Sequence, residues 1–183
     1  MVQINDPDGK AVGVSLTGNR LDVSARADSR IYYVSRDDGQ AYSITSIDSP
    51  SAADEYNLFF KNTSSNKNFV VSEFLVSSAV LTIFKISTVT DATPATGTAI
   101  TPVNLNATSA NEADATVLGN AAVVNLVEKN LLFTLNINAD DQVHFDTHDS
   151  IILGKNDAIA IEYDVGAGSD TIHLTMFGYY DPE

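Results

Sequence analysis

The stretch YNLFFKNTSSNKNFVVSEFLVSSAVLTIFKIS, residues 56–87, decides the fold of this chain. It contains three runs rich in Phe, Val, Ile, Leu and Tyr, which are residues 56–60, 69–76 and 80–86. Polar residues separate these runs at 62–68 and 77–78. Short apolar runs bounded by Asn and Ser are typical of β-strands, whereas a helix needs apolar residues that return every three or four positions. The stretch therefore predicts three strands, and we expect them to form the central antiparallel meander of an all-β domain.

The last third of the chain shows a clear two-residue alternation of apolar and polar side chains. Apolar residues occupy every second position of 131–137, 159–165 and 172–176. Polar residues stand between them, so we expect each strand to bury one face and expose the other to water. Turn-forming residues flank these strands at 140–141, 154–157 and 166–169.

The remaining segments give weaker signals. Residues 31–34 and 41–47 predict two short strands around a turn at 35–39. Residues 88–122 are rich in Thr, Ala, Asn and Ser, and they resemble strands only at 99–105 and 115–118. Together these patterns predict about ten to twelve strands and no helix, which is typical of a β-sandwich. Among sandwiches we predict the jelly-roll type.

The chain divides into an arm and one domain. Residues 1–28 are poor in apolar side chains and carry a turn signal, Gly18-Asn19, between Leu16 and Leu21. This arrangement predicts a short β-hairpin. Because an isolated hairpin is marginal in water, we expect the arm to pack on the main domain or on a neighbouring subunit. Residues 29–183 are predicted to form a single β-sandwich domain.

Composition argues against several classes of partner. The chain has 183 residues, no cysteine and a net charge of −14, from 24 acidic and 10 basic residues. Without cysteine the fold has neither disulfides nor thiolate metal ligands. The acidic charge argues against a nucleic-acid partner, which requires clustered Lys and Arg. No signal peptide is visible, and no apolar run approaches the roughly 20 residues that span a membrane, so we expect a soluble protein without a membrane partner.

The histidines offer few candidate metal ligands. His144 and His148 lie in QVHFDTHD, residues 142–149, and His173 lies on the polar face of the last strand. Positions four apart on a strand are roughly 13 Å from each other, so only a bend could bring His144 and His148 to one divalent cation. We expect solvated polar residues here and assign no metal ligand.

Acidic turns occur at several places. The segment that ends in Gly9 fails the spacing of an EF-hand calcium loop, because alignment on that glycine places Ile4 at the first ligand position. We interpret Asp37-Asp38, Asp54-Glu55 and Asp140-Asp141 as turn and surface charges. Calcium bound at these turns, for instance between subunits, stays an open alternative.

Catalytic motifs are missing from the sequence. It has no G-x-S-x-G elbow, no Walker loop and no G-x-G-x-x-G, and it has no Trp to stack on a sugar. A glycosidase pair of carboxylates stays open, because its spacing is invisible in a sequence. We predict that the chain is not an enzyme and assign no catalytic residue, no cofactor-binding residue and no cofactor. Tyr32-Tyr33 and Tyr179-Tyr180 are interpreted as core or rim residues, or as anchors of an interface.

Four segments carry a resemblance to a known group of proteins. They include the motifs KNTSS, GTAITPVNLN, ILGKND and GYYD, and they are residues 29–48, 58–78, 97–120 and 152–181. In this order they resemble small structural proteins of tailed bacteriophages. The resemblance implies a virion component, such as a capsid decoration or cement protein on the head, with a jelly-roll-like fold. It also implies a homotrimer that binds the major capsid protein, assembled onto the virion after synthesis in the cytoplasm of the host bacterium.

Two other functions stay open. One is a receptor- or glycan-binding module of a phage tail fibre or adhesin, which would recognise a host surface ligand through loops at one end of the sandwich. The other is a hydrolase, which would need a deep pocket with a perturbed histidine or carboxylate. Within the virion interpretation, we expect the arm and residues 97–118 to contact other subunits or the capsid shell.

Overall fold

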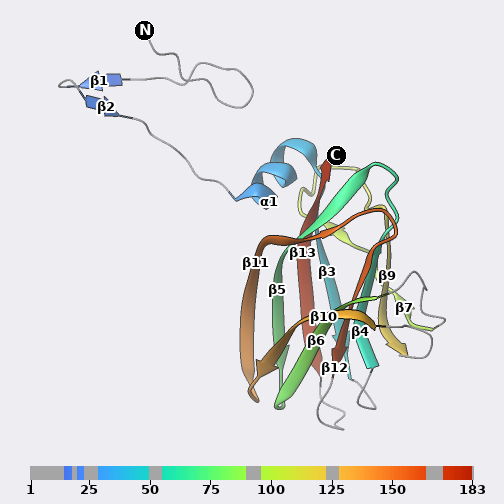
Figure 1. The fold of residues 1–183 in the computed structure, drawn as a ribbon. Helices are drawn as coiled ribbons and strands as arrows, with labels where there is room; N and C mark the ends of the chain where they lie inside the picture. Colours follow the sequence, from blue (N-terminus) through green and yellow to red (C-terminus); the bar gives the residue numbers. More distant parts are fainter. Residues whose placement is uncertain are drawn as a thin grey trace.

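The strands from β3 to β13 form two antiparallel sheets, which pack face to face as a β-sandwich, and most consecutive strands lie in opposite sheets (Figure 1). The computed structural model describes residues 15–17, 20–22, 29–49, 55–89, 96–122, 128–163 and 171–182. One sheet consists, in order, of β10 (Glu128–Ile137), β6 (Thr82–Val89), β12 (Ala158–Tyr163), β4 (Glu55–Asn62), β9 (Ala115–Ala122) and β7 (Thr98–Ala99). The other consists of β11 (Asp141–Leu153), β5 (Lys67–Ser78), β13 (Ile172–Pro182), β3 (Ala41–Asp48) and β8 (Val103–Asn104). The predicted all-β sandwich is confirmed, while its jelly-roll type and the domain boundary at residue 28 stay predictions.

The core lies between the two sheets, where the alternation of each strand turns its apolar side chains inward. Phe60 of β4 meets Phe69 of β5 across the core, with ring centroids 4.3 Å apart. The three apolar runs of residues 56–87 do form β4, β5 and β6. The expected meander is wrong, because β12 separates β4 from β6 and β5 belongs to the opposite sheet. Consecutive strands on opposite sides of the core bury their apolar faces against each other, which a meander in one sheet would not achieve.

The crossing from β4 to β5 is held by the side chain of Asn62, which is fully buried. Its Nδ2 donates hydrogen bonds to the carbonyl oxygens of Lys67 (2.9 Å) and Leu153 (2.8 Å), and its Oδ1 accepts one from the N–H of Ser64 (2.9 Å). Leu153 ends β11, which crosses to β12 beside it. One amide therefore ties together two crossings and satisfies backbone groups that would otherwise be buried without a partner.

A short helical segment replaces the strand predicted at 31–34. Helix α1 (Arg30–Tyr33) begins after Ser29, whose Oγ accepts a hydrogen bond from an N–H of the helix (3.4 Å). A π-helical turn, η1 (Val34–Asp38), follows and ends at Gly39 in the left-handed conformation, with φ 59°. A serine cap and a left-handed glycine are helix boundaries. The expectation of a chain without helix is therefore wrong, because a four-residue apolar run is too short for its periodicity to separate helix from strand.

Strand β12 is buried on both faces, although its alternation predicts one face exposed to water. All six of its residues are buried, and Glu162 keeps only 6% of its surface exposed. The strand lies between β4 and β6, and its outward Ala158 and Ala160 join an apolar cluster with Tyr56 and Phe59. The outer face of the six-stranded sheet is therefore partly a second core.

The predicted alternation is confirmed in β13 and in most of β10. In β13 the inward Ile172 and Met176 are buried and the outward His173 is exposed. In β10 the register shifts between Leu131 and Phe133, and Leu131 is 53% exposed. The shift explains why Leu131 does not share the buried face of the residues that follow it.

The polar stretch after β6 contributes strands to both sheets. The strand predicted at 99–105 is wrong as a single element, because β7 pairs in the six-stranded sheet and β8 in the other. The strand predicted at 115–118 is confirmed and extends as β9 to residue 122. Its backbone pairs with β4 from Glu55 to Asn62.

The arm contains the predicted hairpin. β1 (Ser15–Thr17) pairs antiparallel with β2 (Arg20–Asp22), with Leu16 opposite Leu21. The predicted turns at 6–9 and 166–169 lie outside the described residues. Within the described ranges, no helix is both long and apolar enough to cross a membrane.

We predict that Asn62→Ala lowers the free energy of unfolding by about 3 kcal/mol, because it leaves two buried carbonyl oxygens and one N–H without their partner. Urea denaturation followed by tyrosine fluorescence measures this change. Asn136→Ala is the matched control, since Asn136 is an exposed asparagine in β10, and we expect a change within about 0.5 kcal/mol. Equal effects of the two substitutions would contradict the role given to Asn62.

Candidate functional site

The outer faces of the two sheets differ. That of the six-stranded sheet carries the buried cluster described above. On the five-stranded sheet, twelve outward residues stand in three rows across the strands and are exposed or half-buried. The rows, from β11 across β5 and β13 to β3, are Gln142–Ser77–His173–Ile47, His144–Leu75–Thr175–Thr45 and Asp146–Glu73–Phe177–Ser43. We call this surface the open face.

Apolar side chains are prominent on the open face. Leu75 and Phe177 are half-buried in adjacent rows at its centre, and Ile47 is 63% exposed at one border. Val103 of β8 extends the row of Phe177 beyond Ser43 and is 62% exposed. Leu75 and Phe177 are diagonal neighbours, whereas polar residues separate Ile47 and Val103 from them. Exposed apolar side chains rimmed by polar residues are typical of a surface that binds another protein.

The open face carries few acidic side chains. Its two carboxylates belong to Glu73 and Asp146. His144 Nε2 lies 2.6 Å from the carboxylate of Glu73, and His148 Nδ1 lies 3.2 Å from that of Asp146. Each carboxylate therefore has an imidazole beside it, and only two of the twelve residues of the face are acidic.

The bend that a metal site at 142–149 requires does exist, and the histidine contact that forms at it is the one between His148 and the carboxylate of Asp146. The pairing of β11 with β5 shifts after Asp146, and His148 has a left-handed backbone with φ 52°. Thr147 stabilises the bend, because its Oγ1 donates to the carbonyl oxygens of Val71 and Ser72. Among the residues that the structure describes, no group of three or more His, Cys, Asp and Glu side chains could hold a metal ion. That no residue of this segment ligates a metal stays a prediction.

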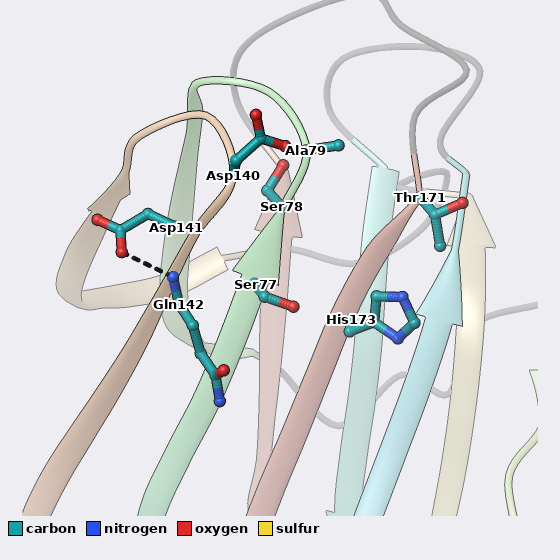
Figure 2. A pocket seen from close by; sticks show the side chains of 8 residues that line it. All are labelled: Ser77, Ser78, Ala79, Asp140, Asp141, Gln142, Thr171 and His173. Carbon is teal, nitrogen blue, oxygen red and sulfur yellow. Dashed lines mark hydrogen bonds between the residues drawn. The ribbon is translucent and has the colours of Figure 1, made fainter.

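A shallow depression of about 370 Å³ adjoins the open face where β5 ends and β11 begins (Figure 2). It brings His173 of β13 to the same surface as Ser77, Asp140 and Asp141. Asp141 Oδ1 accepts a hydrogen bond from the N–H of Gln142 (2.8 Å). Asp140 has φ 59°, and its N–H donates to the carbonyl oxygen of Ser78 (3.0 Å). The two aspartates therefore act as turn residues, as their sequence suggests.

The described histidines contact carboxylates or solvent. His144 and His148 pair with carboxylates, and His173 lies exposed on the open face. In the described part of the chain, no serine hydroxyl forms a hydrogen bond with a histidine. A Ser–His pair is the contact on which that chemistry depends.

The acidic turn before β3 is part of the helical segment. Asp37 accepts hydrogen bonds from the guanidinium of Arg36, at 2.6 and 2.8 Å, and Asp38 is exposed. Arg36 also lies over the exposed ring of Tyr32, 5.5 Å from its centroid. Asp54 lies outside the described residues.

The two tyrosine pairs meet at one end of the sandwich. Tyr33 packs against a cluster on the outer side of β13 that contains the buried Tyr179, whereas Tyr32 is 45% exposed. Tyr180 points into the main core, where its ring meets Tyr42 edge to face. Three of the four residues therefore pack on or inside the sandwich, and Tyr32 lies at its rim.

Burial raises the pKa of both tyrosines at the end of β13. For Tyr179, the nearby carboxylate of Asp149 adds to the effect of burial, and for Tyr180 that of Asp114 does so. The hydroxyls of Tyr180 and Tyr42 are buried without a hydrogen-bond partner. A phenol that is buried beside a carboxylate stays neutral at ordinary pH. Ionisation of these tyrosines would therefore destabilise the folded state.

The sequence patterns do not predict that the outward residues of β11, β5, β13 and β3 form one surface. The alternation places His173 and Thr175 on one side of their strand, and continuing it to Phe177 would have added an aromatic ring to that side. Comparisons of the chain with models of protein families, with curated proteins and with solved structures find no match. We take the open face as the candidate functional site, and the contacts it can make are those of a protein-binding surface.

We predict that Tyr180→Phe stabilises the protein by about 1 kcal/mol at neutral pH, because it removes a buried hydroxyl without a partner. The pKa of Tyr180 in the folded state is above its ordinary value of about 10. Its contribution to stability is therefore complete below that pH and is lost as the pH rises toward the folded pKa.

Urea denaturation between pH 8 and 11 measures both effects. The wild type is expected to lose stability above pH 10 more steeply than Tyr180→Phe. Tyr32→Phe is the control, since Tyr32 is exposed, and it should follow the wild type. Parallel curves for wild type and Tyr180→Phe would contradict the assignment.

Proposed function

We propose that the chain is a non-enzymatic structural protein of a tailed-phage virion, a decoration or cement protein that binds the head and associates with itself as a homotrimer. The open face is the observation that carries this proposal. It is a partly apolar surface with few acidic side chains, on a sandwich whose described residues lack a Ser–His pair and a metal cluster. The resemblance over residues 29–181 supports the same interpretation.

The order of the strands supports the jelly-roll type. Without the short β7 and β8 and the inserted β9, eight strands remain in two sheets of four, β11-β5-β13-β3 and β10-β6-β12-β4. The pairing of these eight strands is nested in chain order: β3 pairs with β13, β4 with β12, β5 with β11 and β6 with β10. A jelly roll has eight strands in two such sheets, an architecture found in viral capsid proteins.

The physical properties of the open face suit adhesion to a shell protein. Burying the side chains of Leu75, Phe177 and Ile47 would contribute roughly 25 cal/mol for each Å² of apolar surface removed from water. Glu73 and Asp146 each have an imidazole as a neighbour, so neither carboxylate loses all of its polar neighbours when the face meets another surface. A rigid sheet also loses little conformational entropy on binding.

A glycan-binding module is a second candidate, favoured by one cavity. It measures about 400 Å³ and lies between the helical segment and the loop after β8, where it is lined by Tyr32, Arg36, Leu105 and Asn106 among others. An exposed tyrosine ring beside amide and guanidinium groups could stack on and hydrogen-bond to a sugar. A glycan array separates the two candidates, because a decoration protein is expected to bind none of its sugars.

We predict that quantitative mass spectrometry of purified virions finds this chain in a number of copies comparable to that of the major capsid protein. A decoration protein covers the repeating shell, so its abundance follows that of the shell. A handful of copies per particle would favour the tail-fibre alternative. Absence from the particle would refute the virion assignment.

A second prediction concerns the open face itself. Thr175→Arg places a long cation at the centre of this face and is expected to reduce binding to undecorated heads at least tenfold, as measured by co-sedimentation. Thr134→Arg is the matched control on an exposed position of β10, and it should bind like the wild type. If Thr175→Arg decorates heads normally, the open face is not the surface that binds them.

A further inference from the structure

One edge of the five-stranded sheet has a stretch of backbone without a neighbouring strand. β8 is only two residues long and pairs with β3 at Tyr42 and Ser43 alone. The rest of β3, from Ile44 to Asp48, has β13 on one side and no paired strand on the other within the described residues. We call residues 44–48 the open edge.

Two hydrogen bonds fix which backbone groups point to that edge. The N–H of Tyr180 in β13 donates to Gln40 O (3.0 Å), and the N–H of Leu105 donates to Ala41 O (2.8 Å) on the opposite side. Because successive residues of a strand direct their N–H and C=O to opposite sides, odd-numbered residues of β3 point away from β13. The N–H and C=O of Thr45 and Ile47 therefore point out of the open edge, and no described residue forms a hydrogen bond with them.

A groove runs beside the open edge. Its volume is about 340 Å³, and it is lined by residues 45–48 of β3 and by Thr98, Ile100, Gly119 and Asn120 from the region of β7 and β9. The packing beneath it is tight, since a Cβ on Gly119 would lie 2.8 Å from Ile100 Cδ1 and 3.0 Å from Ser46 Oγ. An added strand would find backbone partners in β3 and apolar contacts at Ile47 and Ile100.

The opposite edge of the same sheet is protected. β11 carries Asp141, Asp146 and Asp149 along its length and bends where His148 has a left-handed backbone. Charges and bends of this kind keep edge strands from pairing with other chains. The open edge has neither device between Ile44 and Ile47, so it is the edge of this sheet that suits an added strand.

The arm supplies a strand that needs a neighbour. β1 and β2 pair only with each other among the described strands, and each is three residues long. A two-stranded hairpin is marginal in water until a third strand or another surface joins it. Its length matches the three residues from Thr45 to Ile47 that present unpaired backbone groups. Residues 23–28 can span about 20 Å between hairpin and body.

We propose that the β1–β2 hairpin of a second copy of this chain adds to the open edge of β3, so that the five-stranded sheet continues from one subunit into the next. Within one chain the described strands β1 and β2 do not pair with β3, and we therefore assign the hairpin to β3 of a neighbouring copy. Such a contact joins two different surfaces and closes into a ring when the rotation between copies allows it. This inference rests on the proposed self-association and names the surfaces that perform it.

Proline at position 45 tests the backbone contact. Thr45→Pro removes an N–H that points away from β13, so the pairing of β3 with β13 is expected to persist. Thr45→Val is the matched control, because both variants lose the 3.0 Å contact between the hydroxyls of Thr45 and Thr175. Light scattering after gel filtration should give three times the monomer mass of 19.6 kDa for wild type and Thr45→Val, and the monomer mass for Thr45→Pro. Equal masses for the two variants would overturn the proposal.

Cysteine cross-linking tests the same contact without proline. Because the chain has no cysteine of its own, any disulfide must involve the introduced residues. Full-length Leu16→Cys and Ile47→Cys chains, mixed and oxidised, should form a disulfide between different chains, identified by peptide mass spectrometry. Leu16→Cys mixed with Asn136→Cys is the control and should form none. A bond that forms only within one chain carrying both cysteines, or no bond at all, would overturn the proposal.

The two proposals fail separately. Virions that carry many copies of the chain while cross-linking gives no bond between chains would leave the proposed function standing and remove the inference. Cross-linked trimers from a chain absent from virions would do the reverse.

Discussion

The fold depends on a constraint at the ends of its strands, where the chain repeatedly crosses between sheets and must satisfy the backbone that it buries. Asn62 meets that constraint at the crossing from β4 to β5, with one amide bonded to Lys67 O and Leu153 O and its own backbone bonded to the turn before β12. A comparable arrangement holds the other end, where the N–H of Asp140 donates to Ser78 O. These bonds hold the β4–β5 crossing beside the β11–β12 crossing, and the β5–β6 crossing beside the β10–β11 crossing.

The outer face and the β3 edge of the five-stranded sheet can make different kinds of contact. Its outer face offers side chains, of which Leu75 and Phe177 are the apolar centre, while its edge at β3 offers backbone groups at Thr45 and Ile47. Side-chain surfaces bind through shape and burial, whereas an open edge binds any strand that fits its groove. In the function that we propose, a subunit contacts a shell protein with its face and a neighbouring copy with its edge at the same time.

Sequence patterns predicted the strands and the sandwich, because two-residue alternation in segments such as 172–176 records directly which side chains are buried. They could not predict which strands are neighbours, and the expected meander failed for that reason. The helix at Arg30–Tyr33 was missed because its apolar run is one turn long, and the buried outer face of β12 was missed because neighbouring segments create it. The sequence predicts part of the candidate site, since the alternation places His173 and Thr175 on the outward side of their strand. It does not predict the open edge, because that edge depends on where β8 stops pairing with β3.

Charge gives these surfaces their specificity. A net charge of −14 makes copies of the chain repel one another over most orientations, which opposes nonspecific association. On the open face, Glu73 and Asp146 each have an imidazole within 3.2 Å, and the open edge carries no charged side chain from Ile44 to Ile47. Both surfaces carry few acidic side chains, so we expect repulsion between copies to be weaker there than elsewhere on the chain. The same acidic composition that argues against nucleic-acid binding thus favours association through these two surfaces over others.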